Sequence, residues 1–586
     1  MLKKTGYLRD FLIIAFVACL VLLPQILSKS VVLGSDAIFH FNRFYDTAQQ
    51  IKTWHFNYFQ SNFGFQQAGR IITPMYGPMF SYIFGLVLLF VGSWLKLQLL
   101  MNLFVLVFGG YGIYLLSRKV GSDDRIAVLI GILFLSSVSV SAWVLKQHFT
   151  SVGLIFIPYI LFFGTSFIDS SRVNVIGLAI SVAALVQTHF LSALFVVCAL
   201  TVFFIVGLFV NANRKSMIIR TILSGLLAIL LTMNIWFGLI SVYGKNILLS
   251  TWPYTDLDAG SISLSFGVES ETQLGLILSF AFIFQIVYVC MNFHKQSLYN
   301  KVFTLSGAFF LVLSSKLILW NRLEEIFPQL ATLLQYPSRI RGIATILLLV
   351  GLAISVSEFG KNSKLASRYT RICLAVMATF TFFSLYANVN YAANKWYSDT
   401  PIGVTNAVVG VDKLNAEKVR NAFRSSDLSA GLRLVQKTTP DYLPVQSKYD
   451  NQEYVNLHPY GLVEKYLINN SAGFKKTTNK NGELIVTWNS TSSDKAVLPV
   501  VVYHESKIVL NGKTLNIKKV NLTKINNPIL DQKKGANKLV LGIKAAKHFS
   551  LMLWITIMSW IVVIIVAIFI VVLSGKEKLK YHLTES

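Results

Sequence analysis

Charged residues, and acidic ones above all, are scarce in this chain. Only 14% of its 586 residues are charged, and Asp and Glu together number 27. Because a soluble globular protein carries about a quarter charged residues, this composition excludes a soluble fold for most of the chain. Hydrophobic residues make up 54% of it and the mean hydropathy is +0.58, which is typical of a protein that crosses a membrane several times.

Cysteine is also rare, and its placement argues against two kinds of cross-link. The four cysteines, Cys19, Cys198, Cys290 and Cys373, all fall inside apolar runs and lack metal-ligand spacing. We therefore expect neither a disulfide framework nor a structural zinc. The histidines show no metal-ligand spacing either, so we expect no metal and no cofactor at a functional site.

Motifs for nucleotide chemistry and for nucleic-acid binding are absent as well. The chain has no Walker loop, no dinucleotide fingerprint and no nucleophile elbow. Energy for a reaction would therefore come from an activated lipid-linked substrate. The net charge is +26, but many of the cations lie in short loops between apolar runs, as is typical of cytoplasmic loops. No basic stripe with interleaved aromatic residues marks a soluble surface, so we expect no nucleic-acid partner.

What the chain does have is a series of long apolar runs. A run of about 20 such residues is long enough to cross the hydrocarbon layer. The first, residues 11–27, lacks a small-residue cleavage site, which favours a retained helix over a cleavable signal peptide. The candidate membrane helices are 9–28, 76–95, 97–117, 125–143, 150–168, 173–189, 190–210, 218–240, 273–293, 301–320, 340–357, 370–388 and 549–574.

Basic loops predict the orientation of these helices. Both termini are expected on the cytoplasmic side. The outer side then holds 144–150, His189, 241–272, 321–339 and 389–548. However, full crossings at both 76–95 and 97–117 would put Arg118 on the wrong side. A partial or re-entrant element near residues 74–95 resolves this and leaves 12 crossings, while 13 or 14 remain open.

One large polar segment, residues 389–548, precedes the last apolar run. Residues 483–488, 499–510, 513–517 and 538–544 have strand composition, and Asn511-Gly512 suits a type I′ turn. The segment carries 23 Lys and Arg against 12 Asp and Glu, which either attracts an anionic lipid or polymer or is ordinary surface charge.

These patterns predict a polytopic α-helical membrane protein with about 12–14 transmembrane helices and a small extracytoplasmic β-rich domain before the last helix. The expected domains are a transmembrane domain, a mixed or β-rich domain, and a C-terminal helix with a cytoplasmic tail. They cover residues 1–388, 389–548 and 549–586.

The acid with the clearest functional signal is Asp36. It lies at the mouth of the first membrane helix, one helical turn before His40 and two before Arg43. Ionisable groups at the edge of a membrane are costly to hold there and usually serve a site. Residues 36–52 are expected to form a short helix lying in the membrane interface, with Asp36 and His40 on the same helical face.

This carboxylate suits glycosyl transfer from a phosphate-linked donor. That reaction needs a base for the acceptor hydroxyl proton and cations for the leaving phosphate. We take Asp36 as the catalytic base. The substrate-binding candidates near outer helix ends are His40, Arg43, Arg70, Lys146, His148, His189, Arg339 and Arg341. The alternatives are interfacial snorkelling for the cations, packing or capping for His40, and a turn between two helices at His189.

The segment 334–341 adds a possible anion site. It precedes a membrane helix and combines Pro337 with Arg339 and Arg341. Free backbone N–H groups at a helix start, together with guanidinium groups, bind anions. Since Arg is unfavourable at the positive end of a helix dipole, an anionic partner explains the pair better than a plain helix start. The acids of loop 241–272, Asp256, Asp258, Glu269 and Glu271, are expected to be solvated, with a second acidic contribution to the site as the alternative.

The order of one helix, an Asp-bearing outer loop, many helices and an outer C-terminal domain resembles the GT-C glycosyltransferases. More closely, the chain resembles the bacterial YfhO-type membrane proteins and the integral membrane family related in name to 6-pyruvoyl-tetrahydropterin synthase. The matching pieces, spread over nearly the whole chain, are Gly34-Ser35-Asp36 with His40 and Arg43, then 335–339, 440–444 and the β region from Leu498. Where that family usually has Phe before the proline and Trp after it, this chain has Tyr336 and Ser338. The cation is kept, and Tyr336 becomes a substrate-binding candidate.

The resemblance implies transfer of a sugar from a polyprenyl-phosphate donor at the outer leaflet of a bacterial plasma membrane. The acceptor would be lipoteichoic acid or another anionic envelope polymer, and membrane lipid would be a further partner. We therefore expect an inverting, metal-independent glycosyltransferase. One alternative is a lipid or polysaccharide transporter or flippase, which would need mid-helix charges and internal repeats that the sequence shows little sign of. The other is a non-catalytic envelope assembly protein.

Overall fold

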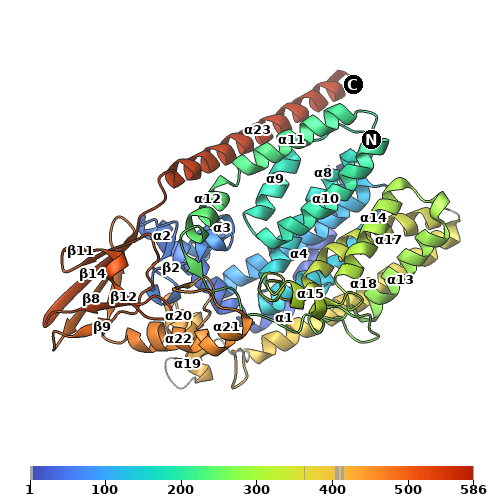
Figure 1. Ribbon diagram of the computed structural model, residues 1–586. Coiled ribbons are helices and arrows are strands. Elements are labelled where there is room, and N and C mark those ends of the chain that lie inside the picture. Colours follow the sequence, from blue (N-terminus) through green and yellow to red (C-terminus); the bar gives the residue numbers. More distant parts are fainter. Residues whose placement is uncertain (1–3, 362, 403–407, 411–414, 585–586) are drawn as a thin grey trace.

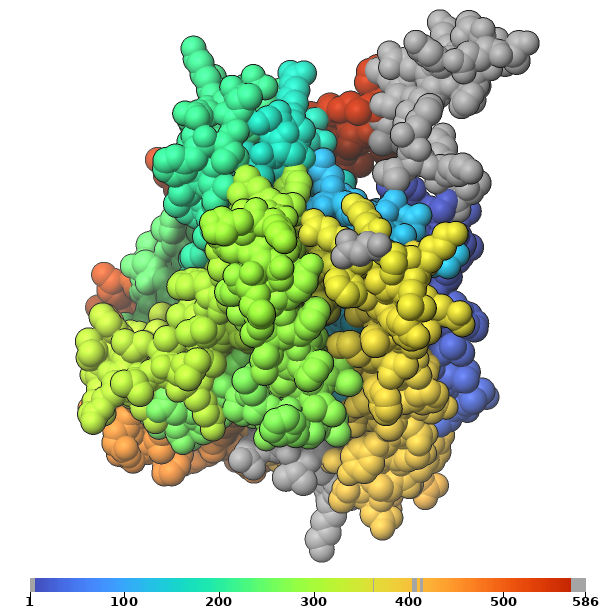
Figure 2. Space-filling model, turned by 90° about the vertical axis from the view of Figure 1, so that its right-hand side faces the viewer, coloured from blue at the N-terminus to red at the C-terminus, as the bar shows by residue number. Residues whose placement is uncertain are grey.

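The fold is a bundle of long helices with a β-rich domain at one end (Figure 1). It is described by a computed structural model that covers residues 4–361, 363–402, 408–410 and 415–584. The N-terminal helix and the last helix both have their outer ends on the side away from the strands, in agreement with the expectation that both termini lie on the same side. Figure 2, turned so that the right-hand side of Figure 1 faces the viewer, shows the green and yellow parts of the chain covering most of this face, with the orange and red C-terminal part only at its edges.

Seven described helical segments are long and apolar enough to span a membrane, or nine if each of two bent pairs is one span. The bent pairs are α5 (Asp124–Ser136) with α6 (Val138–Lys146), at 43°, and α11 (Arg214–Leu230) with α12 (Met233–Tyr243), at 59°. The long ones are α1 (Lys4–Ser28), α4 (Trp94–Lys119), α7 (Phe149–Leu154) with α8 (Ile157–Gly164), α10 (Phe190–Val210), α17 (Arg341–Gly360), α18 (Lys364–Lys395) and α23 (Phe549–Thr584).

Three shorter apolar helices belong to the same bundle: α9 (Val175–Val186), α13 (Gly275–Met291) and α14 (Leu298–Leu313). Helices α13 and α14 form a hairpin whose two ends lie close together. Gln273, just before α13, pairs with Ser263, and Ser315, just after α14, pairs with Ile262. None of these three is long enough to pass as a full span by itself, so the described residues contain seven to nine helices that could cross a membrane, and the expected number of 12–14 crossings stays a prediction. The multi-pass architecture is thereby confirmed.

The residues that flank the fourth short helix, α3 (Pro78–Val91), on both sides contact the β-rich end of the protein. It follows Tyr76 and Gly77, which line a cavity at the β-rich end. Three residues after its end, the Trp94 indole N–H donates to the carbonyl oxygen of Leu428 in the polar domain at 3.0 Å. This agrees with the expected partial element near residues 74–95. A helix of 14 residues is also too short to cross by itself.

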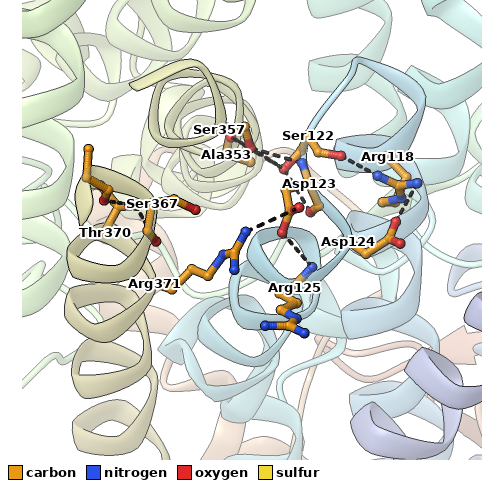
Figure 3. A network of polar contacts seen from close by, with 11 residues as sticks. Arg118, Ser122, Asp123, Asp124, Arg125, Ala353, Ser357, Ser367, Thr370 and Arg371 are labelled. Atoms are coloured by element: carbon orange, nitrogen blue, oxygen red, sulfur yellow. Dashed lines mark hydrogen bonds and ion pairs between the residues drawn. The ribbon is translucent and has the colours of Figure 1, made fainter. Parts of the chain in front are cut away.

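At the opposite end, polar contacts tie four helices together (Figure 3). The Arg371 guanidinium on α18 lies 3.7 Å from the Asp123 carboxylate at the start of α5. The Ser357 hydroxyl on α17 lies 3.0 Å from the Ser122 hydroxyl and accepts the Asp123 backbone N–H. Arg118, at the end of α4, donates to the Ser122 carbonyl. These contacts fix the spacing of the four helices at this end, and two of them, α17 and α18, line the cavity with their other ends.

The helix expected at residues 36–52 forms as α2 (Ala37–Thr53), but its setting differs from the expectation. Twelve of its 17 residues are buried. It packs against α3, α20 (Ser429–Leu434) and β5 (Val435–Lys437) instead of lying in the membrane interface. Its sequence is aromatic as well as polar, and protein neighbours bury the aromatic side chains better than an interface would.

The β region is an antiparallel sheet in the order β11-β10-β14-β8-β7, followed by a smaller one in the order β12-β13-β9. The expected turn joins β10 to β11, and both Asn511 (φ 48°) and Gly512 (φ 86°) have the positive φ of a type I′ turn. The strands are β7 (Lys475–Thr478), β8 (Leu484–Ser490), β9 (Lys495–Val497), β10 (Ser506–Leu510), β11 (Lys513–Leu515), β12 (Asn521–Leu522), β13 (Pro528–Asp531) and β14 (Gly535–Ile543).

One strand prediction is wrong in its first half. Residues 499–505 are not a strand, although Val501 and Tyr503 are buried. The Val501 backbone N–H donates to the Ala68 carbonyl and the Val502 N–H to the Asn526 carbonyl, so the segment satisfies its backbone with loops instead of a ladder. Its apolar residues are therefore explained by burial against neighbouring loops and not by pairing in a sheet.

Short elements cover the β-rich end of the bundle. They are β1 (Gln60–Ser61), β2 (Arg70–Ile71), β3 (Ile247–Leu248), α15 (Trp320–Ile326), α16 (Leu330–Leu333), β4 (Val408–Gly410), α19 (Ala416–Arg424), β6 (Pro444–Val445), α21 (Asn451–Leu457) and α22 (Pro459–Val463). The polar domain is joined to the bundle by backbone pairing, since β3 pairs with β6 and Leu33 pairs with Ile402.

Candidate functional site

A cavity of about 1740 Å³ lies where the loops of the β-rich end meet the bundle. Segments far apart in the sequence line it: the start of α2, the ends of α6 and α9, the loop before α13, the start of α17 and the loop after β5. Seven of the residues singled out from the sequence are among those lining it: Asp36, Lys146, His148, His189, Tyr336, Arg339 and Arg341.

Asp36 occupies the N-terminal cap position of α2. Its side chain is 38% exposed, and one of its carboxylate oxygens lies 3.6 Å from the Lys437 Nζ. Its backbone N–H donates to the Lys146 carbonyl at 3.1 Å, which ties the start of α2 to the end of α6. The partial positive charge at a helix N-terminus attracts an anion, so this carboxylate is held in the cavity by a helix dipole and a lysine.

Arg339 is positioned by the turn of 3-10 helix (Pro337–Ile340) that precedes α17. Its guanidinium donates to the Leu334 carbonyl at 3.0 Å and to the Gln335 side-chain oxygen at 2.8 Å. It also lies 5.5 Å from the centre of the Tyr336 ring. Within the described ranges no carboxylate forms an ion pair with it. Arg341, by contrast, lies 3.8 Å from the Glu269 carboxylate.

His40 and Arg43 are buried behind the cavity wall and do not line it. The Arg43 guanidinium lies 3.0 Å from His40 Nδ1, donates to the carbonyls of Tyr76 and Gly77, and sits 4.8 Å from the centre of the Phe149 ring. Burial lowers the pKa of Arg43 to about 10 and holds the pKa of His40 well below its usual value. Arg43 therefore stays charged behind Tyr76 and Phe149, while His40 is neutral.

Arg70 is the third candidate away from the cavity surface. It is fully buried on β2, lies 5.6 Å from the centre of the Phe65 ring and donates to the Asp441 carbonyl at 2.9 Å. Its contact with the backbone of residue 441 braces the loop after β5, and that loop carries cavity-lining residues. The structure thus gives Arg70 a supporting contact with the site.

The cavity also contains residues to which sequence reasoning had assigned no role. Lys437, Asp441 and Tyr442 all line it. The motif around Pro440 was visible in the sequence, but no pattern indicated that Lys437, just before it, lies beside Asp36 at the start of α2. Glu271 lines the cavity too and contacts Lys146 and His148, so it is not simply solvated as its loop suggested.

The other two singled-out residues have clear local roles. His189 caps the N-terminus of α10, where its ring accepts the Ser192 backbone N–H at 3.2 Å, so it both marks the turn and lines the cavity. Burial lowers its pKa to about 3, so the ring is neutral. Tyr336 packs its ring 4.6 Å from that of Tyr254, which gives the cavity an aromatic wall beside Arg339.

The pKa of Asp441 leads to a first testable expectation. Burial raises it to about 6; Arg70 and Lys437 lower it, and Asp36 raises it further. The folded protein thus holds this proton more tightly than the unfolded chain, where the ordinary value is 3.8. Ionisation of Asp441 therefore lowers the free energy of unfolding. The full loss is present above about pH 6, and it disappears at pH values well under 3.8. Asp441→Asn should raise the thermal unfolding midpoint relative to the parent at pH 8.

The rise in the unfolding midpoint of Asp441→Asn should shrink as the pH falls below about 6 and be largely gone at about pH 4. Unfolding followed by tryptophan fluorescence in detergent at both pH values measures it. Asp531→Asn, at an exposed residue of β13, is the matched control and should show no such pH dependence. An equal stability difference at the two pH values would contradict the raised pKa of Asp441.

Comparison with known proteins adds no assignment. No protein-family model matches the chain, and no curated protein matches it. Among the described residues no group of three or more His, Cys, Asp or Glu side chains is arranged to hold a metal ion. The helix lengths and hydropathy identify a multi-pass membrane protein.

Proposed function

We propose that this protein is a membrane glycosyltransferase that moves a sugar from a polyprenyl-phosphate donor to a cell-envelope acceptor. The strongest support is that a carboxylate and an arginine without an ion-pair partner among the described residues line the same cavity. The Asp36 carboxylate and the Arg339 guanidinium both line it, and Arg339 has no ion-pair partner in the described parts of the chain. A cation that is largely removed from water and unpaired is costly, and a phosphate group would compensate it.

The two groups suit the two needs of the reaction. Asp36 would take the proton of the acceptor hydroxyl as it attacks the anomeric carbon. Arg339 would bind the phosphate that leaves with the lipid, through charge-assisted hydrogen bonds. Arg341 and Lys146 are already near carboxylates and would contribute less. His40, Arg43 and Arg70 would support the walls of the site.

The setting of the proposed reaction follows from the resemblance to GT-C enzymes and YfhO-type proteins. The cavity would open at the outer leaflet of a bacterial plasma membrane, with the polar domain extracytoplasmic. Membrane lipid would surround the donor's polyprenyl chain. The net charge of the polar domain, with 23 Lys and Arg against 12 Asp and Glu, favours an anionic acceptor such as lipoteichoic acid or another envelope polymer.

An assay with labelled donor tests this proposal against its rivals. The purified protein, reconstituted in liposomes, would be given a polyprenyl-phosphate sugar with a radiolabelled sugar group and an extract of envelope polymers. A glycosyltransferase moves the label to the polymer. A flippase moves the labelled lipid between leaflets without transfer, and an assembly protein does neither, so either of these results would overturn the proposal. Mass spectrometry of co-purified lipid would identify the carrier.

A further inference from the structure

Three cavity-lining side chains are arranged in a row beside Asp36. The Ser35 hydroxyl oxygen lies 3.0 Å from Nε2 of His148. On the other side of the ring, Nδ1 of His148 lies 3.0 Å from a carboxylate oxygen of Glu271. All three residues line the cavity. They come from the loop before α2, the loop between α6 and α7, and the loop before α13, so only the fold brings them together.

The charges favour one proton arrangement in this row. Burial opposes the ionised form of Glu271, but the contacts with His148 and Lys146 outweigh it and lower the pKa of Glu271 to about 2. Lys146 Nζ lies 3.1 Å from the same carboxylate oxygen. An ionised carboxylate beside Nδ1 keeps the proton on that nitrogen, so Nε2 is an acceptor for the Ser35 hydroxyl at 3.0 Å, closer than the Lys146 carbonyl that the hydroxyl also meets at 3.3 Å.

Backbone donors are close to this serine as well. Ser35 directly precedes Asp36, the capping residue of the 17-residue helix α2. The Asp36 side chain does not cap the helix by a hydrogen bond, and in the described structure the N–H groups of Ile38 and Phe39 have no acceptor. Free N–H groups at the start of a helix stabilise an oxyanion that develops nearby.

We propose that Ser35, His148 and Glu271 form a catalytic triad that cleaves carboxylic esters of lipids or lipid-linked glycans. This is a second activity in the same cavity and does not rest on the proposed sugar transfer. The three roles are those of nucleophile, base and orienting acid. The apolar side chains of the cavity lining, such as Leu154 and Leu194, suit the lipid part of the substrate, and a serine nucleophile with a histidine base suits cleavage of an ester bond.

Each step of the reaction balances. The Ser35 oxygen attacks the ester carbonyl carbon while His148 Nε2 takes the hydroxyl proton. The bond from that carbon to the alcohol oxygen breaks, and the leaving alcohol takes the proton from His148. Water then attacks the acyl group on Ser35, gives one proton to His148 and releases the carboxylic acid. His148 returns the proton to the serine oxygen.

The direct test is covalent labelling of the purified full-length protein with an alkyl fluorophosphonate. This probe forms a bond between phosphorus and an activated serine oxygen and releases fluoride. Peptide mass spectrometry should find the label on Ser35. His148→Gln and Glu271→Gln should slow labelling about 100-fold or more, the usual contribution of a positioned general base. Hydrolysis of p-nitrophenyl butyrate should fall in parallel.

Ser492→Ala is the control, because Ser492 is exposed in the polar domain, does not line the cavity and has no histidine contact among the described residues. It should label and hydrolyse like the parent protein. An unlabelled Ser35 in the folded parent overturns the proposal without any variant. Labelling that proceeds equally fast in His148→Gln also overturns it. Since neither measurement uses a sugar donor, neither result bears on glycosyl transfer.

Discussion

Asp36→Asn abolishes sugar transfer in the proposed reaction, with a loss of about 1,000-fold or more. Asparagine keeps the size of the side chain but cannot accept the proton of the acceptor hydroxyl, and general base catalysis contributes about 10²–10⁴-fold. The change removes the negative charge beside Lys437, at 3.6 Å, without emptying space. The initial rate of label transfer to envelope polymer measures the loss.

Asp531→Asn serves as the control for this experiment. Asp531 is an exposed acid on β13 in the polar domain and does not line the cavity, so its replacement should leave the rate unchanged. Equal amounts of folded protein would be confirmed by size-exclusion chromatography. Transfer that persists in Asp36→Asn would remove the base assignment, and Asp441 would then be the remaining acid near Lys437 to examine.

Arg339→Gln raises the KM for the polyprenyl-phosphate donor by about 10- to 150-fold. The estimate corresponds to about 1.5–3 kcal/mol for hydrogen bonds to a charged group. This guanidinium has no carboxylate partner in the described chain. Its replacement therefore removes a positive charge from the cavity and leaves no carboxylate without its partner. Arg339→Lys should recover part of the affinity, because it restores the charge but not the planar fork of donors.

Arg322→Gln is the control for this second variant. Arg322 lies on α15, is 75% exposed and pairs with Glu325 at 3.1 Å, so its replacement removes one arginine without touching the cavity. Donor titrations at fixed acceptor concentration give both KM values. A donor KM that is equal in Arg339→Gln and Arg322→Gln would show that the cavity arginine does not hold the phosphate.

Much of the fold could be predicted because the signals are local. Apolar length marks the membrane helices, and alternation with a turn signal marks β10 and β11. The failed strand at 499–505 and the buried setting of α2 share one cause. In both, apolar residues meet other parts of the protein, and composition alone does not say which partner buries a residue.

The candidate site was predicted only in part, for a related reason. Asp36 and Arg339 stood out because charged side chains at helix mouths are rare and costly. Lys437 lies in an ordinary polar segment, so no local signal links it to Asp36, about 400 residues earlier in the chain. Arg43 gave the same signal as Arg339, yet it is buried behind the cavity wall.

The sequence alone was enough to identify a multi-pass membrane protein with a β-rich domain before its last helix. Long apolar runs and the alternation of apolar with polar residues are both properties of short, continuous stretches of chain. Only the tertiary structure decided which polar groups share a cavity. Lys437 reaches Asp36, and His148 with Glu271 reaches Ser35, by long-range packing of loops. Such contacts depend on how helices and loops meet in space, and no spacing along the chain encodes them.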